Sequence, residues 1–234
     1  MDEKSLIESL SHMKDFFEKN KIDYWLDTGT LLGAIREKKF IAWDYDIDIG
    51  IWQKESKKIL SASKDLEKLG YEICYFPIEM CIKILRKNSE IDLNLYNINK
   101  DKATRIWHVP NFLGKKLDYL YWVLTIEKIE LKRSKVSKKF TKNLQKIFSL
   151  IPNFKRKILS KIIIIIYEKI GSKTINVEVP KKFFTNLKEI KFYNIKTKVP
   201  KDTIKYLEKR YGKDWRTPKK DYIYYRDDKS VVKK

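Results

Sequence analysis

Residues 46–51 alternate between two kinds of side chain, and this alternation limits the possible folds of the chain more than any other feature. The segment reads Asp-Ile-Asp-Ile-Gly-Ile. Successive side chains of a β-strand point to opposite faces of a sheet. The segment is therefore predicted to be a strand, with Asp46 and Asp48 on one face and the isoleucines on the other.

The neighbouring segments follow the patterns of helices and strands. Apolar residues recur every three or four positions in the predicted helices and every two positions in the predicted strands. Predicted helices cover 5–20, 30–36 and 53–69, and further predicted strands cover 22–27, 71–77, 80–87 and 90–98. This order predicts an α/β (α+β) fold.

The chain is strongly basic. It has 52 Lys plus Arg against 31 Asp plus Glu, a net charge of +21, which attracts an anionic partner such as nucleic acid, a membrane surface or a phosphorylated small molecule. Twelve of the basic residues lie between Lys128 and Lys161, with one acid among them. We therefore expect a core over 1–114, a basic helical insertion over 115–178, and a C-terminal segment over 179–234 that packs back on the core.

Several classes of protein are excluded. Two cysteines and two histidines are too few for a zinc cluster or a disulfide framework. Neither GxGxxG nor GxxxxGK[ST] occurs, so dinucleotide-binding and P-loop folds lose their main signal. The N-terminal MDEKSLIESL is charged and has no long apolar stretch, so no signal peptide is expected, and no run of about 18 apolar residues occurs. A cytoplasmic location is expected.

Carboxylates in this pattern are candidate metal ligands. Asp46 and Asp48 share a strand face, Asp44 joins that face if the strand begins early, and Asp92 interrupts the apolar strand Ile91-Asp-Leu-Asn-Leu. Neighbouring carboxylates repel each other, whereas a hard cation such as Mg²⁺ or Mn²⁺ stabilises them and also binds phosphates. An exposed strand end would give the same alternation around Asp46 and Asp48 without a cation.

A turn precedes these acids. The segment Asp27-Thr-Gly-Thr follows a predicted strand and begins a predicted helix. Its Gly29 permits a tight turn and a close approach of the backbone to a phosphate.

These segments together resemble a known family. The sequence DTGTLLGAIR at 27–36 and WDYDIDIG at 43–50 are similar to the hallmark motifs of the LicD/fukutin-related phosphotransferases, in the nucleotidyltransferase superfamily. The segment YGKDWRTP at 211–218 resembles the closing motif of that family. The resemblance implies a nucleotidyltransferase-like mixed sheet flanked by helices, with the catalytic core in 1–114.

The resemblance also implies an activity. Members transfer a phosphorylated alcohol from a CDP-activated donor to a hydroxyl of a glycan and release CMP. Phosphocholine from CDP-choline is the usual bacterial case, and ribitol phosphate and glycerol phosphate are alternatives. The acceptors are teichoic acids, lipopolysaccharide and related cell-surface glycans.

Each candidate site residue receives an expected role on this basis. Asp46 and Asp48 are expected to hold Mg²⁺ or Mn²⁺. Asp92 is expected to hold a second metal ion or to take the proton of the acceptor hydroxyl. The remaining candidates are a residue behind the metal ligands, Asp44, and the substrate-binding residues Gly29, Thr30, Arg36 and Lys83.

Two other functional classes stay open. One is an NTP-dependent nucleotidyltransferase that releases diphosphate, and the other is a basic nucleic-acid-binding module with a degenerate site. The second is disfavoured because the acids would repel a phosphate backbone, so no nucleic acid partner is expected. The expected partners are a CDP-alcohol and a glycan acceptor, either free or lipid-linked. The basic insertion is also expected to contact the anionic inner face of the membrane.

Overall fold

The computed structural model describes residues 2–76, 81–125 and 138–232. The described residues form two compact units. The first comes from Met1–Phe76, Met80–Ile106 and Asn176–Lys234, and the second is built around Trp107–Ile175. The boundaries that the sequence places after residues 114 and 178 stay a prediction.

The helices and strands in the N-terminal part of the first unit follow one another in the order that the hydrophobic pattern predicts. Their order is α1 (Glu3–Lys19), β1 (Tyr24–Leu26), α2 (Thr28–Arg36), β2 (Ile47–Trp52), η1 (Gln53–Glu55), α3 (Ser56–Ser61), α4 (Ser63–Lys68), β3 (Glu72–Phe76), β4 (Cys81–Arg86) and β5 (Ser89–Asn99). The predicted helix over 53–69 is therefore three short helical segments, with a break at Ala62.

Two long strands and a set of shorter elements follow in the chain. The strands are β6 (Lys102–Pro110) and β7 (Ser172–Pro180). The later elements are α8 (Lys182–Thr185), β8 (Leu187–Phe192), β9 (Ile195–Pro200), α9 (Thr203–Tyr211) and α10 (Tyr224–Asp227).

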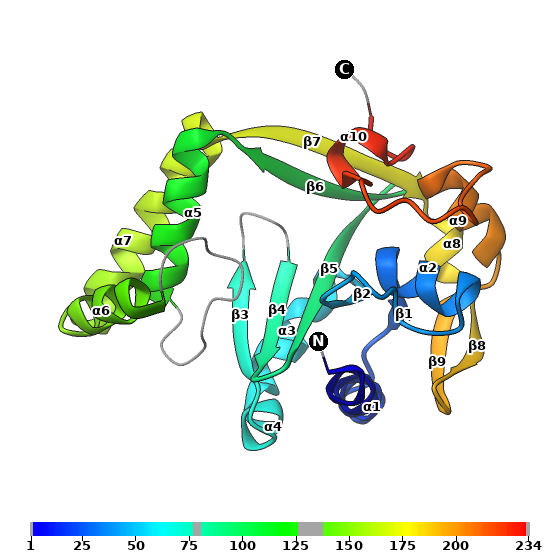
Figure 1. The fold of residues 1–234 in the computed structure, drawn as a ribbon, viewed down its shortest axis with the longest axis horizontal. Helices are drawn as coiled ribbons and strands as arrows, with labels where there is room; N and C mark the ends of the chain where they lie inside the picture. Colours follow the sequence, from blue (N-terminus) through cyan, green and yellow to red (C-terminus); the bar gives the residue numbers. More distant parts are fainter. Residues whose placement is uncertain (1, 77–80, 126–137, 233–234) are drawn as a thin grey trace. The chain divides into compact units, whose positions relative to one another are not determined.

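The main sheet contains both parallel and antiparallel strands. Its order is β1-β2-β5-β4-β3, and β6 pairs with β5 and with β7. Strand β2 runs parallel to β5, whereas the β1–β2, β5–β4 and β4–β3 pairs are antiparallel. Figure 1 shows β2, β5, β4 and β3 side by side, with helices against the sheet. The predicted mixed sheet flanked by helices is confirmed.

One face of β2 is part of the hydrophobic core. Ile47, Ile49 and Ile51 are 0% exposed, whereas Asp48 on the opposite face is half-buried. Burial of each isoleucine contributes roughly 1.5–3 kcal/mol. A shift of the register by one residue would turn these isoleucines out of the core, so the core fixes the face on which Asp48 lies.

The second unit is helical. It contains α5 (Phe112–Thr125), α6 (Lys138–Ser149), α7 (Asn153–Ile166) and the π-helical turn η3 (Tyr167–Gly171). Helix α5 packs against α6 and α7 (Figure 1). Pro152 precedes α7 as its N-cap and separates this helix from α6. Part of the predicted basic segment, residues 126–137, lies outside the described residues. None of the described helices is both long and apolar enough to cross a bilayer.

Candidate active site

A row of charged side chains crosses three strands of the main sheet. Asp48 on β2 is the register partner of Asp92 on β5, and Asp92 is the register partner of Lys83 on β4. Register partners place their side chains on the same face of a sheet. The sheet therefore brings together three of the residues that the sequence predicts for the site.

Three aspartates form a group that could hold a metal ion. Asp44, Asp46 and Asp48 each offer a carboxylate oxygen, and these oxygens all lie within 4.8 Å of one another. Oxygen ligands at this density suit Mg²⁺ or Mn²⁺. The sequence places Asp44 behind the ligands, whereas in the structure it lies among them. The acidic group fits the metal site that the sequence predicts.

Electrostatics around these aspartates favour a bound cation. Burial, together with the nearby Asp48 and Asp46, raises the pKa of Asp44 to about 9. Burial also raises the pKa of Asp48 to about 7, and Asp46 contributes to this shift. Both shifts report the free energy needed to keep several half-buried carboxylates ionised side by side. A divalent cation would remove that repulsion.

A second acidic group shares Asp46 with the first. Asp46, Glu90 and Asp92 also place carboxylate oxygens within 4.8 Å of one another. Here the ammonium of Lys83 donates to Oδ1 and Oδ2 of Asp92 over 2.8 and 2.7 Å, and to Oε1 of Glu90 over 3.0 Å. Lys83 is only 2% exposed. Its predicted contact with substrate stays a prediction.

The first turn of α2 supports Asp48. The Gly29 N–H donates to Oδ2 of Asp48 over 3.1 Å, and the Asp48 N–H donates to Oγ1 of Thr30 over 2.8 Å. A Cβ atom on Gly29 would lie 2.2 Å from Oδ2 of Asp44, so a side chain here would displace that carboxylate. Gly29 and Thr30 thus position the acidic group, and their predicted phosphate contacts stay a prediction.

A buried carboxylate lies behind the acidic group. Asp27 is 0% exposed and accepts hydrogen bonds from Asn94, Tyr96 and Tyr206. The same Asn94 amide donates to Oδ1 of Asp48 over 3.3 Å. Asp27 therefore supports the acidic group from the protein interior, through the Asn94 side chain that it shares with Asp48. No local pattern in the sequence indicates this role, although Asp27 begins the first motif.

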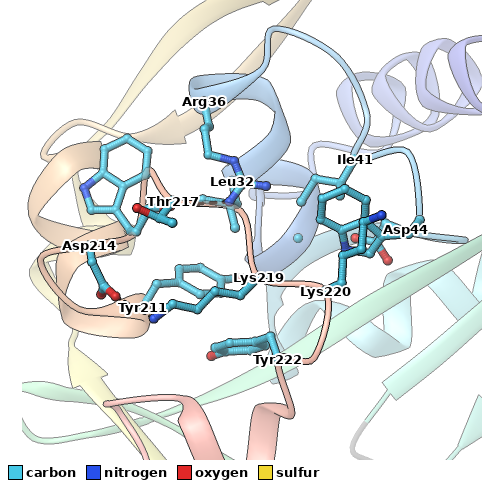
Figure 2. Close-up of a pocket in the computed structure, with 13 residues that line it drawn as sticks. Leu32, Arg36, Ile41, Asp44, Tyr211, Asp214, Thr217, Lys219, Lys220 and Tyr222 are labelled. Atoms are coloured by element: carbon cyan, nitrogen blue, oxygen red, sulfur yellow. Dashed lines mark hydrogen bonds and ion pairs between the residues drawn. The ribbon is translucent and has the colours of Figure 1, made fainter.

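A pocket of about 190 Å³ adjoins the acidic group. Figure 2 shows Arg36 on one side of it, Tyr211 and Tyr222 on the opposite side, and Asp44 at one end. Its lining comes from two distant parts of the chain, namely Gly29, Leu32, Arg36, Ile41, Trp43, Asp44, Tyr211, Asp214, Trp215, Thr217, Lys219, Lys220 and Tyr222. The pocket therefore joins the first sequence motif to the closing motif.

Cations and aromatic rings both line this pocket. The Arg36 guanidinium pairs with Glu37 and also donates to the Trp215 carbonyl over 3.4 Å. The Lys220 ammonium lies 5.3 Å from the centre of the Trp43 ring. Arg36 thus lines the pocket, and its predicted contact with substrate stays a prediction. No local pattern singled out Lys220.

The family is established by comparison with known proteins. The model of the family described as "LicD/FKTN/FKRP, nucleotidyltransferase domain" matches residues 21–149, which is more than half of the chain. The chain belongs to this family, which confirms the resemblance read from its motifs.

Relatives match over shorter segments. An uncharacterized Rickettsia prowazekii protein is 33% identical over 103 residues, which cover 44% of this chain and 36% of that protein. The Haemophilus influenzae lipopolysaccharide cholinephosphotransferase LicD is 43% identical over 51 residues, 22% of this chain and 19% of that protein. The human ribitol 5-phosphate transferase FKRP is 38% identical over 52 residues, 22% and 10% of the two chains. The chain thus matches about a third of the length of the rickettsial protein.

Among solved structures, the lincomycin-bound lincosamide antibiotic adenylyltransferase LnuA is similar with a TM-score of 0.40 at 15% identity. The match covers 82% of this chain and 78% of that chain.

Proposed function

We propose that this protein transfers a phosphorylated alcohol from a CDP-activated donor to a hydroxyl of a cell-surface glycan and releases CMP. The first candidate for the alcohol phosphate is phosphocholine. One observation carries the proposal: two motif segments, far apart in the sequence, line a single pocket beside the carboxylates of Asp44, Asp46 and Asp48. The names of the Haemophilus influenzae and human relatives, a cholinephosphotransferase and a ribitol 5-phosphate transferase, support the same class of transferred group.

The proposed reaction is a phosphoryl transfer. The acceptor oxygen forms a bond to the phosphorus that carries the alcohol, the bond from that phosphorus to the CMP oxygen breaks, and the acceptor hydroxyl loses its proton. Negative charge grows on the phosphate oxygens, so positioning and electrostatics supply most of the rate. A bound Mg²⁺ or Mn²⁺ would supply positive charge to those oxygens.

The residues of this chain have separate proposed roles in this reaction. Asp46 and Asp48, with Asp44, are the proposed metal ligands. Asp92 is the proposed acceptor of the hydroxyl proton, because its carboxylate lies on the same face of the sheet as Asp48, its register partner on the neighbouring strand. The Gly29 amide and the Thr30 hydroxyl keep Asp48 in place.

The pocket is proposed to hold the nucleotide half of the donor. The rings of Trp43, Tyr211 and Tyr222 offer faces on which a base can stack, and Lys220 and Arg36 attract phosphate. A trimethylammonium group would meet like charge from the same two cations. This favours the nucleotide in the pocket and the alcohol outside it.

A panel of donors tests the proposal. The full chain is incubated with Mg²⁺ and CDP-choline, CDP-ribitol or CDP-glycerol, together with a glycan acceptor, and CMP is measured by chromatography. Release of CMP from at least one donor, dependent on the metal and on Asp46, is expected. Parallel reactions with CTP and ATP test for diphosphate. Diphosphate release without CMP release would replace the proposal with an NTP-dependent nucleotidyltransferase.

An anionic membrane surface is the proposed partner of α7. The exposed residues Phe154, Ile158, Ile162 and Ile165 recur every three or four positions, so they form one apolar stripe on this helix. The exposed Lys155, Lys157 and Lys161 lie on the same helix. A helix with an apolar stripe and flanking lysines suits the interface of an anionic bilayer. A lipid-linked acceptor glycan would be found there.

A further inference from the structure

The positively charged ammonium of Lys83 lies within the second acidic group, whose carboxylates could otherwise hold a metal ion. Its ammonium nitrogen lies within 3.0 Å of three oxygens of the second acidic group, two from Asp92 and one from Glu90. That group shares Asp46 with the first group. A pair of divalent ions in two-metal phosphoryl-transfer sites typically lies about 3.5–4 Å apart and shares ligands in this way.

The fold fixes Lys83 in this position. Lys83 lies between Asp92 on one neighbouring strand and Cys74 on the other, in register with both. Its side chain is 2% exposed, so water cannot take over the solvation of a displaced ammonium. A buried ammonium is costly unless carboxylates surround it, which makes withdrawal from Asp92 and Glu90 unfavourable.

The ammonium also competes with a metal ion for the same oxygens. Mg²⁺ binds its oxygen ligands at about 2.0–2.1 Å and demands a near-octahedral arrangement. An ion that used Asp92 and Glu90 would have to displace Lys83 or lie directly against it. Like charges at that separation in a buried site repel strongly.

We propose that the Lys83 ammonium replaces a second divalent cation, so that the protein binds one ion at Asp44, Asp46 and Asp48. Lys83 is then a positioning residue that supplies fixed positive charge beside the metal and holds Asp92. This inference rests on the proposed function, because it concerns the metal site of the proposed reaction. Under this proposal Asp92 pairs with Lys83 and is not a metal ligand.

Counting bound ions tests this proposal without turnover. The full chain, free of nucleotide, is titrated with Mn²⁺ by equilibrium dialysis with metal analysis. The wild type is expected to bind one equivalent in the tight phase. The Lys83→Met variant keeps the length of the side chain and removes the charge, so it is expected to bind a second equivalent. The Lys83→Arg variant keeps the charge and is expected to bind one.

Two equivalents bound to the wild type with similar affinity would overturn the proposal, as would one equivalent in a folded Lys83→Met protein. If Lys83→Met does not fold, the Asp92→Asn variant decides. Loss of a direct ligand would remove the tightly bound equivalent, whereas the proposal predicts that one tight equivalent remains, weakened by no more than the roughly 10–100-fold typical of a residue outside the metal's ligands. Failure of every CDP-alcohol to release CMP would reject the proposed function and leave these counts unchanged.

Discussion

Arg210 donates from Nε to Oδ2 of Asp228 over 2.6 Å, and both side chains are almost fully buried. The same guanidinium donates to the hydroxyls of Tyr96 and Tyr206, which in turn donate to Asp27. The closing motif that lines the pocket begins at the next residue, Tyr211. The buried pair therefore fixes both ends of the C-terminal segment that completes the site.

Replacing Arg210 with Met should destabilise the protein by about 3–5 kcal/mol, because Asp228 would be left as a buried charge without its partner. Urea unfolding measures this change. The double variant Arg210→Met with Asp228→Leu should recover part of the loss. The control is Arg226→Met, whose side chain is 55% exposed and pairs with the adjacent Asp227. Equal loss of stability in the control and Arg210→Met would show that the buried pair has no special role.

Replacing Asp46 or Asp48 with Ala should abolish phosphoalcohol transfer while the protein stays folded. Both residues belong to the group of carboxylates that a divalent ion would neutralise. Without metal, the stability of either variant should equal or exceed that of the wild type, because one repulsive charge has been removed. Release of CMP and the unfolding midpoint check the two parts. Asp15→Ala, which alters an exposed carboxylate on α1, is the control. A double Asp46/Asp48 variant with near wild-type turnover would refute the site.

The metal-free protein should lose stability as the pH rises above the ordinary carboxyl range. Burial first, and then neighbouring aspartates, raise the pKa of Asp44 to about 9 and that of Asp48 to about 7. In the unfolded chain both groups titrate near pH 4. A raised folded-state pKa gives stability that is fully present below the unfolded value and is lost as the pH rises through the folded value.

Thermal unfolding in EDTA measures this dependence. Relative to Asp44→Asn, which cannot ionise, the Tm of the wild type should fall by several degrees between about pH 5 and about pH 9. Added Mg²⁺ should raise the wild-type Tm more at the higher pH, because fewer protons then compete for the carboxylates. Parallel pH profiles of the two proteins would contradict the electrostatic account of this site.

The sequence predicts the local part of the site and misses the part that depends on distant contacts. Alternation at 46–51 is a property of a single strand, and the strand β2 begins one residue later, at Ile47. Asp46 therefore precedes the strand, although its carboxylate lies within 4.8 Å of that of Asp48. The parallel pairing of β2 with β5 sets Asp92 opposite Asp48, and no local pattern encodes that pairing. Helix α2 begins at Thr28, two residues before the predicted start, and its first turn then holds Asp48.

Burial explains the remaining differences. Asp27 stands in a hydrophilic motif, where an exposed role is the natural expectation, yet four polar side chains from distant segments surround it. Lys220 belongs to a basic C-terminal stretch, and the sequence does not distinguish it from the other lysines there. Only the contact of its ammonium with the Trp43 ring places it at the pocket.

Replacing Lys220 with Gln should weaken nucleotide binding several-fold, because the pocket loses one of the charges that attract phosphate. Quenching of tryptophan fluorescence by added CMP measures the affinity. The control Lys188→Gln removes the same charge from an exposed position on β8, outside the pocket. Equal weakening in both variants would mean that net charge, and not this pocket, governs binding.

Helix α7 should attach the protein to anionic vesicles. Each lysine close to an anionic surface contributes about 1 kcal/mol, and this attraction fades within a Debye length of about 8 Å. The triple change of Lys155, Lys157 and Lys161 to Gln should therefore weaken vesicle binding roughly a hundredfold. The matched control changes three exposed lysines of the first unit, Lys188, Lys191 and Lys205, to Gln. It alters the net charge equally and should weaken binding much less.

Substitutions in the apolar stripe of α7 distinguish membrane contact from simple charge attraction. Ile158 and Ile162 are 55% and 46% exposed, so their replacement by Gln removes apolar surface without changing charge or emptying a core. Co-sedimentation with anionic vesicles should fall, whereas Ile204→Gln, at a similarly exposed isoleucine on α9, should leave it unchanged. Salt should weaken binding of the wild type. Equal recovery with neutral and anionic vesicles would refute the membrane contact, and retention only by a phosphorylated glycan would make α7 a binding element for the acceptor.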